Sequence, residues 1–450
     1  MTPQELTDRV SVNFREMGAL LNISNDQFIR TTDPAHKKAV QAIWQKMAAA
    51  GDIYLDKYAG WYAMRDEAFY GEEELIVDAQ GNKTAPTGAP VEWVEEESYF
   101  FKLSAWQDRL LAFYDKHPEF IQPSYRRNEV VSFVKSGLRD LSVSRTTFDW
   151  GVKVPGDERH VMYVWVDALT NYISALGYPD TNNPQFRTFW PANVHMVGKD
   201  ILRFHAVYWP AFLMSAGIEP PKTVFAHGWW MNEGQKMSKS LGNAISPQEL
   251  AATYGLDQTR YFLMREVVFG NDGDFSRTGM ANRINAELAN NLGNLVQRTL
   301  SQISKNCEAK VPVPGVLEDV DKALLDKAGQ ALLAAVRAEF DKMQFSKAIE
   351  EIIQVANAAN IYIDEQAPWT LKKTNQERMA TVLYVLAEVI RNLGIIMQPF
   401  SPAAARILDQ VAVAPEARDF TFMGALHDLE SGTPLPKPEG VFPRYVEAAA

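Results

Sequence analysis

Hydrophobic residues recur at helical spacing along the first fifty positions. Two segments repeat every three or four residues, one near residues 6–17 and one between residues 34 and 47. Such spacing places apolar side chains on one face of a helix. We therefore predict two helices, the second beginning at Thr32-Asp33-Pro34, where a capping residue precedes proline. Between them, residues 26–32 are expected to form a short strand or a turn.

The pattern changes at residue 51. Aromatic runs alternate with glycine and proline up to residue 90, which favours short β-strands joined by turns. Residues 103–117 carry the spacing of an amphipathic helix. Glutamates cluster between residues 92 and 97, where a solvated face is the preferred reading over a set of metal ligands. We interpret residues 51–125 as an insertion between two parts of a larger domain, the first part being residues 1–50.

Residues 126–240 alternate between apolar runs and helical segments. Runs at 162–166, 194–197 and 225–229 predict buried parallel strands, and helices are expected from Asp167 and over residues 201–214. Parallel strands whose carboxyl ends turn into helices create the crevice in which α/β sheets bind ligands. The predicted fold here is an α/β, nucleotide-binding, Rossmann-like domain.

The helical period continues from residue 282 to about residue 412. Apolar residues spaced by three and four fill residues 324–340, 345–363 and 379–397, with breaks at prolines. We predict an all-α bundle domain over residues 282–430, joined by a linker region at 241–281. The last residues, 431–450, are rich in proline and glycine and are expected to form an extended tail packed on the bundle.

Composition narrows the class of protein. The chain has 450 residues, of which 46% are hydrophobic and 22% charged, as in globular proteins of two or three domains. No run of 18 apolar residues and no signal sequence is found, so we expect a cytoplasmic protein without a membrane partner. The net charge of −11 argues against a general electrostatic grip on nucleic acid. A single cysteine, Cys307, excludes an internal disulfide and a cysteine-based zinc knuckle.

One stretch of the sequence contains residues suited to binding a polyphosphate. Lys236-Met237-Ser238-Lys239-Ser240 places two lysines three residues apart, and Gly234 and Gly242 flank it. A loop of this kind can present ammonium groups to a polyphosphate, where they stabilise charge that builds up in nucleotidyl transfer. Taken alone, any such pair of lysines is more often a solvated surface loop.

The context of this stretch resembles the signature loop of class I aminoacyl-tRNA synthetases. His227-Gly228 precedes it and Gly242-Asn243 follows it. The resemblance implies that Lys236 and Lys239 act in catalysis on bound ATP. The ATP-binding residues that it implies are Gly198, Asp200, His227, Gly228, Lys236, Met237, Ser238 and Lys239.

Two further segments resemble the methionine pocket of bacterial methionyl-tRNA synthetases. The segment from residue 164 to 172 looks like one pocket motif, although this chain has Leu169 where the family more often has proline. Gly198-Lys-Asp-Ile-Leu-Arg-Phe-His205 resembles the next. The resemblance implies methionine-binding roles for five residues, namely Trp165, Ala168, Tyr172, Ile201 and His205. Without it, a place in the hydrophobic core would be the better interpretation of Trp165 and Tyr172.

The helical region is similar to the anticodon-binding elements of the same family. Asn294 and Arg298 are one helical turn apart, and Trp369 follows a proline. In the family, a tryptophan stacks on an unpaired base and polar residues read its edge. This implies tRNA(Met) as the partner. Without the resemblance, Asn294 and Arg298 would be read as an ordinary solvated face.

The function that the resemblance implies is ATP-dependent activation of L-methionine to methionyl-adenylate and its transfer to tRNA(Met), for translation initiation and elongation. ATP and Mg²⁺ are the expected cofactors. No structural zinc is expected, because cysteines are lacking where related enzymes carry them. The family's His-Ile-Gly-His motif is absent, so we expect a truncated product or a late start, with poor methionine activation. The alternatives are an impaired tRNA-binding form, or a sister class I synthetase for another aliphatic amino acid.

Overall fold

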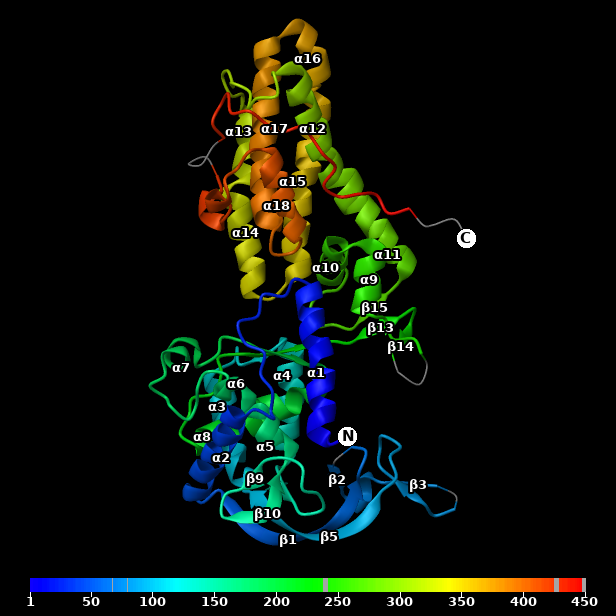
Figure 1. Cartoon of the computed structure of the whole chain (residues 1–450), viewed down its shortest axis with the longest axis vertical. Helices are drawn as coiled ribbons and strands as arrows, with labels where there is room; N and C mark the ends of the chain where they lie inside the picture. Colours follow the sequence, from blue (N-terminus) through cyan, green and yellow to red (C-terminus); the bar gives the residue numbers. More distant parts are fainter. Residues whose placement is uncertain (67, 79, 238–241, 425–428, 447–450) are drawn as a thin grey trace. The chain divides into compact units, whose positions relative to one another are not determined.

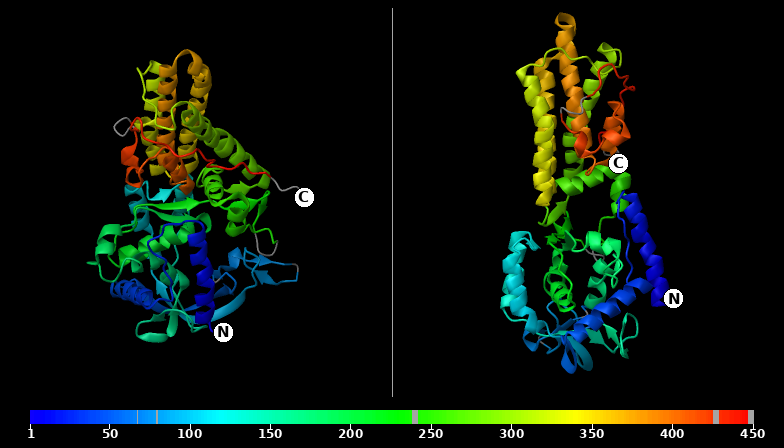
Figure 2. Two further views of the ribbon diagram at one scale, coloured as in Figure 1. Left: turned by 45° about the horizontal axis from the view of Figure 1, so that its top comes forward. Right: turned by 90° about the vertical axis from the view of Figure 1, so that its left-hand side faces the viewer.

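The computed structural model describes residues 1–66, 68–78, 80–237, 242–424 and 429–446. The chain divides into two compact units (Figures 1 and 2). The first unit consists of Met1–Arg15 and Ser24–His227, and the second of Glu16–Ile23 and Gly228–Ala450. Helix α1 (Pro3–Leu20) has no buried residue. Helix α2 (Pro34–Ala49) buries an apolar face, as its spacing predicted. Of the two alternatives for residues 26–32, no strand is present and the segment ends in a turn at Thr31 and Thr32.

A small parallel sheet lies in the first unit. It contains β11 (His195–Gly198), β12 (Val224–His227) and β6 (Ile121–Gln122), in the order β11-β12-β6. Val224, Phe225 and Ala226 are buried, which agrees with their apolar run because both faces of such a sheet are covered. The predictions of strands near residues 194–197 and 225–229 are thereby confirmed at β11 and β12.

The strand predicted at residues 162–166 is wrong. Strand β10 (Asp157–Met162) ends where that run begins, and helix α5 (Val164–Leu169) follows at once. Moreover, β10 is antiparallel to both β8 (Ser144–Arg145) and β9 (Lys153–Val154). Short apolar runs do not distinguish a strand from a buried helix segment. Here Val166 and Leu169 are buried while Val164 is exposed, which is helical spacing.

Residues 51–125 contain one long pair of antiparallel strands rather than short strands alone. Strands β1 (Ile53–Ala63) and β5 (Glu92–Phe101) pair antiparallel, and β2 (Ala68–Tyr70) and β7 (Leu141–Ser142) extend this sheet. Figure 1 shows β1 and β5 curving together. The helix predicted at 103–117 is present as a 3₁₀ turn, Leu103–Trp106, followed by α3 (Gln107–Lys116). The remaining elements are β3 (Ile76–Val77), β4 (Lys83–Thr84) and α4 (Ser124–Lys135).

The second unit begins with a small sheet. It contains β13 (Trp230–Asn232), β14 (Gln235–Lys236) and β15 (Gly273–Phe275), with β13 between the other two. Three helices pack nearby, namely α9 (Pro247–Tyr254), α10 (Leu256–Arg265) and α11 (Arg277–Arg283). A π-helix, Ile284–Gly293, then leads into the bundle.

The predicted helical bundle is confirmed. Its helices lie side by side in Figures 1 and 2 and share one hydrophobic core. They are α12 (Asn294–Asn306), α13 (Asp319–Ala328), α14 (Gln330–Asp341), α15 (Phe345–Gln366), α16 (Pro368–Thr374), α17 (Gln376–Met397) and α18 (Ala405–Gln410).

Helix α17 is the central element of this bundle. By length and composition it is the one helix of the described part that could cross a membrane, yet 94% of its apolar window is buried inside the protein. Such burial is typical of a core helix. The C-terminal segment 429–446 is extended and places Val441 and Phe442 in the bundle core, as expected of a packed tail.

Candidate active site and RNA-binding surface

The structure brings the predicted methionine-binding residues together in the first unit. Trp165 lies on α5, and Tyr172 lies on the next helix, α6 (Asn171–Ser174). His205 lies in a π-helix, Phe204–Tyr208, just after the 3₁₀ turn Lys199–Ile201. The indole of Trp165 meets the His205 ring edge to face, with 6.3 Å between ring centroids. Ala168 lies one helical turn after Trp165 and is half-buried.

A hydrogen-bonded chain fixes the protonation of His205. Its Nδ1 lies 2.9 Å from the carbonyl oxygen of Ile201, and its Nε2 lies 2.8 Å from the Tyr172 hydroxyl. A carbonyl can only accept, so Nδ1 carries the proton and Nε2 accepts from Tyr172. Burial lowers the pKa of His205 and raises the pKa of Tyr172 to about 12. At neutral pH, the hydrogen-bonded groups of Ile201, His205 and Tyr172 therefore all carry no charge.

Two aromatic rings of this site were not predicted from the sequence. Phe204 stacks on Trp165, with centroids 3.8 Å apart and planes 10° apart. His195, on β11, stacks on Tyr172 at 3.9 Å. Phe204 immediately precedes His205, but the π-helix changes the side-chain register there, as π-bulges often do at functional sites. His195 is the first residue of β11, away from the carboxyl end at which ligands were expected, so the sequence carried no signal for it.

His36 links the two short helices α5 and α6 through its side chain. Its side chain is fully buried and lies 2.7 Å from Asp167 on α5 and 2.8 Å from Ser174 on α6. These two contacts come from opposite ring nitrogens, so one imidazole joins both helices. The positions of Trp165 and Tyr172 therefore depend on a polar contact with α2 as well as on packing.

Three predicted ATP-binding residues meet at one edge of the parallel sheet. Gly198 ends β11 and His227 ends β12, and the two are register partners. Asp200 follows two residues after Gly198 in a 3₁₀ turn. The carboxyl ends of neighbouring parallel strands are where α/β sheets bind ligands.

The other predicted ATP-binding residues belong to the second unit. At Gly228 a Cβ atom would lie 2.2 Å from the carbonyl oxygen of Asn271, a backbone contact that only glycine permits. Lys236 ends β14 and places its ammonium group 4.1 Å from the centroid of the Trp229 ring. Met237 is half-buried. Ser238 and the second predicted catalytic lysine, Lys239, lie outside the described residues.

The loop that contains these lysines is held at its two ends. The side-chain amide of Asn243 donates to the carbonyl of Lys236 at 3.2 Å, and Asn232 donates to the carbonyl of Asn243 at 2.8 Å. Glu233 and Gly234 form the β13–β14 turn with φ of 48° and 78°, as a type I′ hairpin turn requires. Residues 236 and 243 are thus kept close together.

The helical bundle carries the predicted anticodon-binding residues. The Arg298 guanidinium lies 5.6 Å from the centroid of the Trp369 ring and is 2.6 Å from Asp364. Trp369 is 41% exposed, although it is a large aromatic residue. Asn294 is exposed one turn before Arg298. A depression of about 240 Å³ lies here, lined by Gln297, Arg298, Ser301, Gln302, Ile363 and Trp369.

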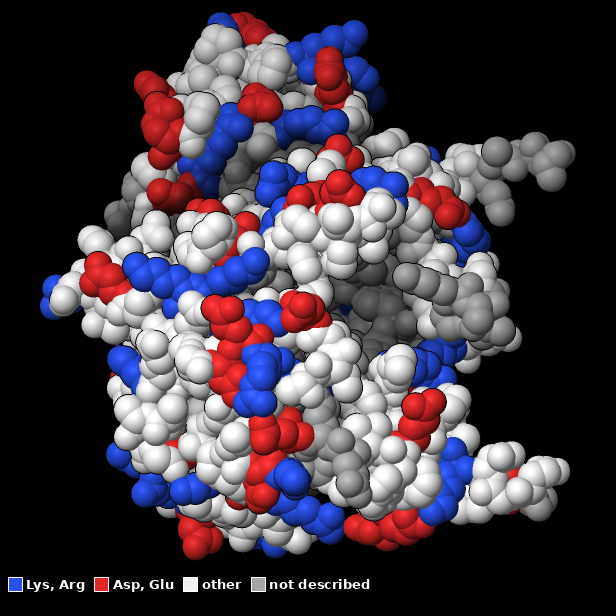
Figure 3. Space-filling view, turned by 60° about the horizontal axis from the view of Figure 1, so that its bottom comes forward, with Lys and Arg blue, Asp and Glu red and all other residues white. Residues whose placement is uncertain are grey.

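Charges of both signs are mixed on one face of the protein (Figure 3). On the face drawn in Figure 3, lysine and arginine side chains lie among aspartate and glutamate side chains. This mixture agrees with a net charge of −11. Recognition of a nucleic acid by this surface would rest on individual contacts rather than on a broad positive field.

Two family models match nearly the whole chain. Residues 1–300 match "tRNA synthetases class I (M)", and residues 311–449 match "Anticodon binding domain of methionyl tRNA ligase". The methionine–tRNA ligase of Brucella suis is 60% identical over all of this chain and 87% of its own length. That of Rhizobium meliloti is 57% identical with the same two coverages.

Solved structures agree with the family models. The methionyl-tRNA synthetase of Mycobacterium tuberculosis in complex with methionyl-adenylate is 52% identical, with a TM-score of 0.95 over 99% of this chain and 88% of that chain. Its apo form gives a TM-score of 0.92 at 51% identity, with the same coverages. The likeness therefore extends over both units.

Proposed function

The chain belongs to the methionyl-tRNA synthetase family of class I ligases, and on this premise we propose which of its residues bind methionine, ATP and tRNA(Met). The reaction is ATP-dependent ligation of methionine to tRNA. The methionine carboxylate attacks the α-phosphorus of ATP, giving methionyl-adenylate and pyrophosphate, and the aminoacyl group then passes to the terminal ribose of the tRNA. Positioning and electrostatics carry these steps, without a side-chain nucleophile.

Methionine is recognised in the uncharged aromatic site of the first unit. Trp165, Tyr172 and Phe204 offer ring surfaces, and a sulfur atom against such a ring contributes about 0.3–1.5 kcal/mol. His205 contacts the substrate as a neutral ring, since its Nε2 accepts from Tyr172. The observation that carries this proposal is the Ile201–His205–Tyr172 chain of hydrogen bonds, because it fixes the polar groups beside the rings without adding charge.

ATP is bound by residues at the ends of two strands and by the lysine loop. Gly198, Asp200 and His227 act at the edge of the parallel sheet in the first unit. In the second unit, Gly228 and residues 236–239 are assigned to ATP binding by their sequence motif. Lys236 and Lys239 neutralise the departing pyrophosphate. Mg²⁺ would neutralise part of the negative charge on the phosphate oxygens. Asp200 suits it as a ligand, because Mg²⁺ takes one or two carboxylates in addition to phosphates and water.

The bundle depression receives an unpaired base of the anticodon. Trp369 presents a half-exposed ring for stacking, and Arg298 and Asn294 offer donors and acceptors for a base edge. Gln297 and Gln302 line the same depression and extend this set of polar groups. In the free protein Arg298 is paired with Asp364. Part of the cost of binding is therefore the loss of that ion pair.

We propose the following division of the chain. Residues 1–50 and 126–240 form the catalytic domain and residues 51–125 its insertion; residues 241–281 are a linker region, 282–430 the anticodon-binding domain and 431–450 a tail. A cytoplasmic location is proposed with this function, since translation takes place there.

Calorimetry with amino acids tests the methionine site directly. The protein should bind methionine more tightly than leucine, isoleucine or valine. Trp165→Ala should raise the Kd for methionine about fivefold, because a lost aromatic contact is worth on the order of 1 kcal/mol, while the Kd for ATP stays the same. Trp93→Ala is the matched control, since Trp93 is an exposed tryptophan of β5. Tighter binding of leucine, or equal losses for methionine and ATP, would contradict the assignment.

A further inference from the structure

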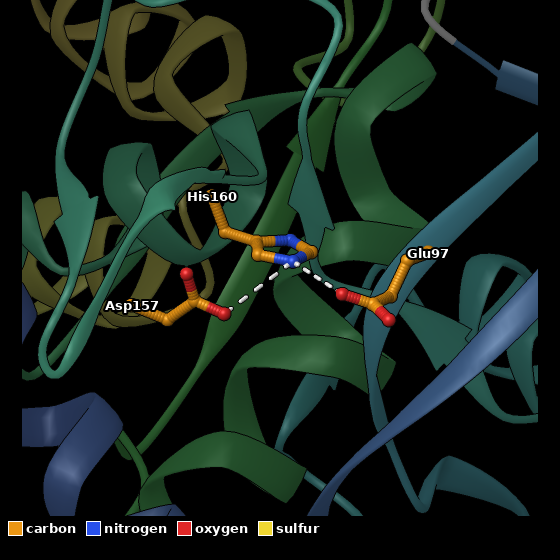
Figure 4. A group of neighbouring side chains, drawn as sticks. All are labelled: Glu97, Asp157 and His160. Atoms are coloured by element: carbon orange, nitrogen blue, oxygen red, sulfur yellow. Dashed lines mark ion pairs between the residues drawn. The ribbon is translucent and has the colours of Figure 1, made fainter.

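Three potential metal ligands converge on one point outside the sites described so far. Glu97 lies on β5, and Asp157 and His160 lie on β10. The Nε2 atom of His160 is 3.6 Å from Oε1 of Glu97 and 3.7 Å from Oδ2 of Asp157. Figure 4 shows both carboxylates directed at this one ring nitrogen. Their three ligand atoms lie within 4.8 Å of one another.

His160 is the unusual member of the group. Its side chain is fully buried, yet its Nε2 has no hydrogen-bond partner within the part of the chain that the structure describes. The ring itself is held in place, because Nδ1 lies 2.9 Å from the Ser144 hydroxyl and Tyr99 packs against it with centroids 4.9 Å apart. A buried ring nitrogen without a hydrogen bond is costly. Its direction toward two carboxylates suggests a ligand between them.

We propose that Glu97, Asp157 and His160 bind a divalent transition metal ion of the zinc class. One imidazole nitrogen and two carboxylate oxygens are donors that zinc accepts, at about 2.0–2.2 Å each. A point equidistant from three atoms at the observed separations lies at most about 2.4 Å from each of them. The side chains therefore need to close by only a few tenths of an ångström. Water would complete a tetrahedral site.

Ser144 and Arg159 both influence how tightly the site would bind a metal ion. Ser144 fixes the ring from its other nitrogen, as residues behind metal ligands commonly do. Arg159 holds the same two carboxylate oxygens, with Nη2 2.7 Å from Asp157 and 3.2 Å from Glu97. Its side chain is 69% exposed and can turn into solvent. A metal ion must displace this guanidinium, so Arg159 competes with the metal.

The metal would join two separate sheets of the first unit. Glu97 belongs to the long β1–β5 hairpin, whereas Asp157 and His160 belong to the β8-β10-β9 sheet. The ion would thus fasten the insertion to the strand that leads directly into α5. The expectation that no structural zinc is present rested on missing cysteines, and this nitrogen and oxygen site is independent of them.

Metal titration of the chelator-treated protein tests the proposal. Zn²⁺ should bind with one saturable equivalent in calorimetry, and Co²⁺ should give the absorption bands of a tetrahedral site. Glu97→Gln and His160→Gln should each weaken Zn²⁺ binding more than about tenfold. Arg159→Gln should strengthen it, because the competing cation is gone. His117→Gln is the control, since His117 forms an exposed pair with Glu119 at a similar 3.6 Å.

Folding is checked separately by circular dichroism. Glu97 is partly exposed, so Glu97→Gln keeps the experiment decisive if His160→Gln fails to fold. The absence of saturable binding in both the unaltered protein and Arg159→Gln would overturn the proposal. Binding that persists in Glu97→Gln but disappears in His117→Gln would overturn it as well.

Discussion

His195 gives the stability of the first unit a predictable dependence on pH. Its ring is buried and stacked on Tyr172, and neither ring nitrogen has a hydrogen-bond partner among the described residues. Burial, followed by the nearby His205, lowers the pKa of His195 to about 3. A proton on this ring would be buried without any group to stabilise it.

The sign and size of the effect follow from this pKa. An unfolded chain protonates His195 below about pH 6.5, whereas the folded protein keeps it neutral down to about pH 3. The stability that depends on the neutral ring is therefore complete above pH 6.5 and is lost progressively as the pH falls toward 3. At pH 5 the unfolded state binds the proton and the folded state does not. This difference lowers the free energy of unfolding by about 2 kcal/mol relative to pH above 6.5.

His195→Phe isolates this contribution, because it keeps an aromatic ring beside Tyr172 and removes the titrating group. The free energy of unfolding is measured by urea titration at pH 7 and pH 5, with pulsed hydrogen exchange of β11 reporting on the first unit. The unaltered protein should lose about 2 kcal/mol more than the variant between these pH values. His117→Phe, at an exposed position, should behave like the unaltered protein. An equal loss in the unaltered protein and His195→Phe would refute the reasoning.

Three further predictions concern the other sites. Trp369→Ala should weaken binding of tRNA(Met) by about 1–3 kcal/mol in filter binding and leave the methionine affinity unchanged, because it removes one base stack. Tyr172→Phe leaves Nε2 of His205 buried without its donor, so calorimetry and thermal unfolding should show a combined loss of about 1–3 kcal/mol. Gly228→Ala forces a Cβ against the Asn271 backbone and should cost about 1–3 kcal/mol in urea unfolding, whereas Gly279→Ala, with no atom closer than 3.4 Å, should not.

Much of the fold follows from periodicity because the relevant elements are long or buried on both faces. Helix α17 and the core strand β12 are of this kind, and both were predicted. The run at 162–166 failed because five apolar residues are too few to separate a period of 2.0 from one of 3.6. The length of the β1–β5 strand pair was also missed, since the run of glutamates in the sequence of β5 interrupts the alternation of polar and apolar residues. The grouping of Glu16–Ile23 with the second unit depends on tertiary contacts alone.

The candidate site was predictable where one short motif carries several residues. Gly198 and His205 came from a single segment of the sequence, and Lys236 came from another. Phe204 and His195 were missed because their roles depend on rings 39 and 23 positions away along the chain, Trp165 and Tyr172. Contacts of this kind arise from packing between elements, and no local spacing encodes them.

The order of donors in the proposed methionine site has a consequence for specificity. The carbonyl oxygen of Ile201 can only accept a hydrogen bond, so neutral His205 donates to it from Nδ1. Its Nε2 then accepts a hydrogen bond from the Tyr172 hydroxyl. With the pKa of His205 lowered and that of Tyr172 raised to about 12, the chain stays neutral at physiological pH. A neutral aromatic site separates methionine from leucine by shape and sulfur contacts, which are worth about 1–3 kcal/mol in total. Rejection of charged side chains is stronger, because neutral His205 and Tyr172 offer no opposite charge to a buried ion.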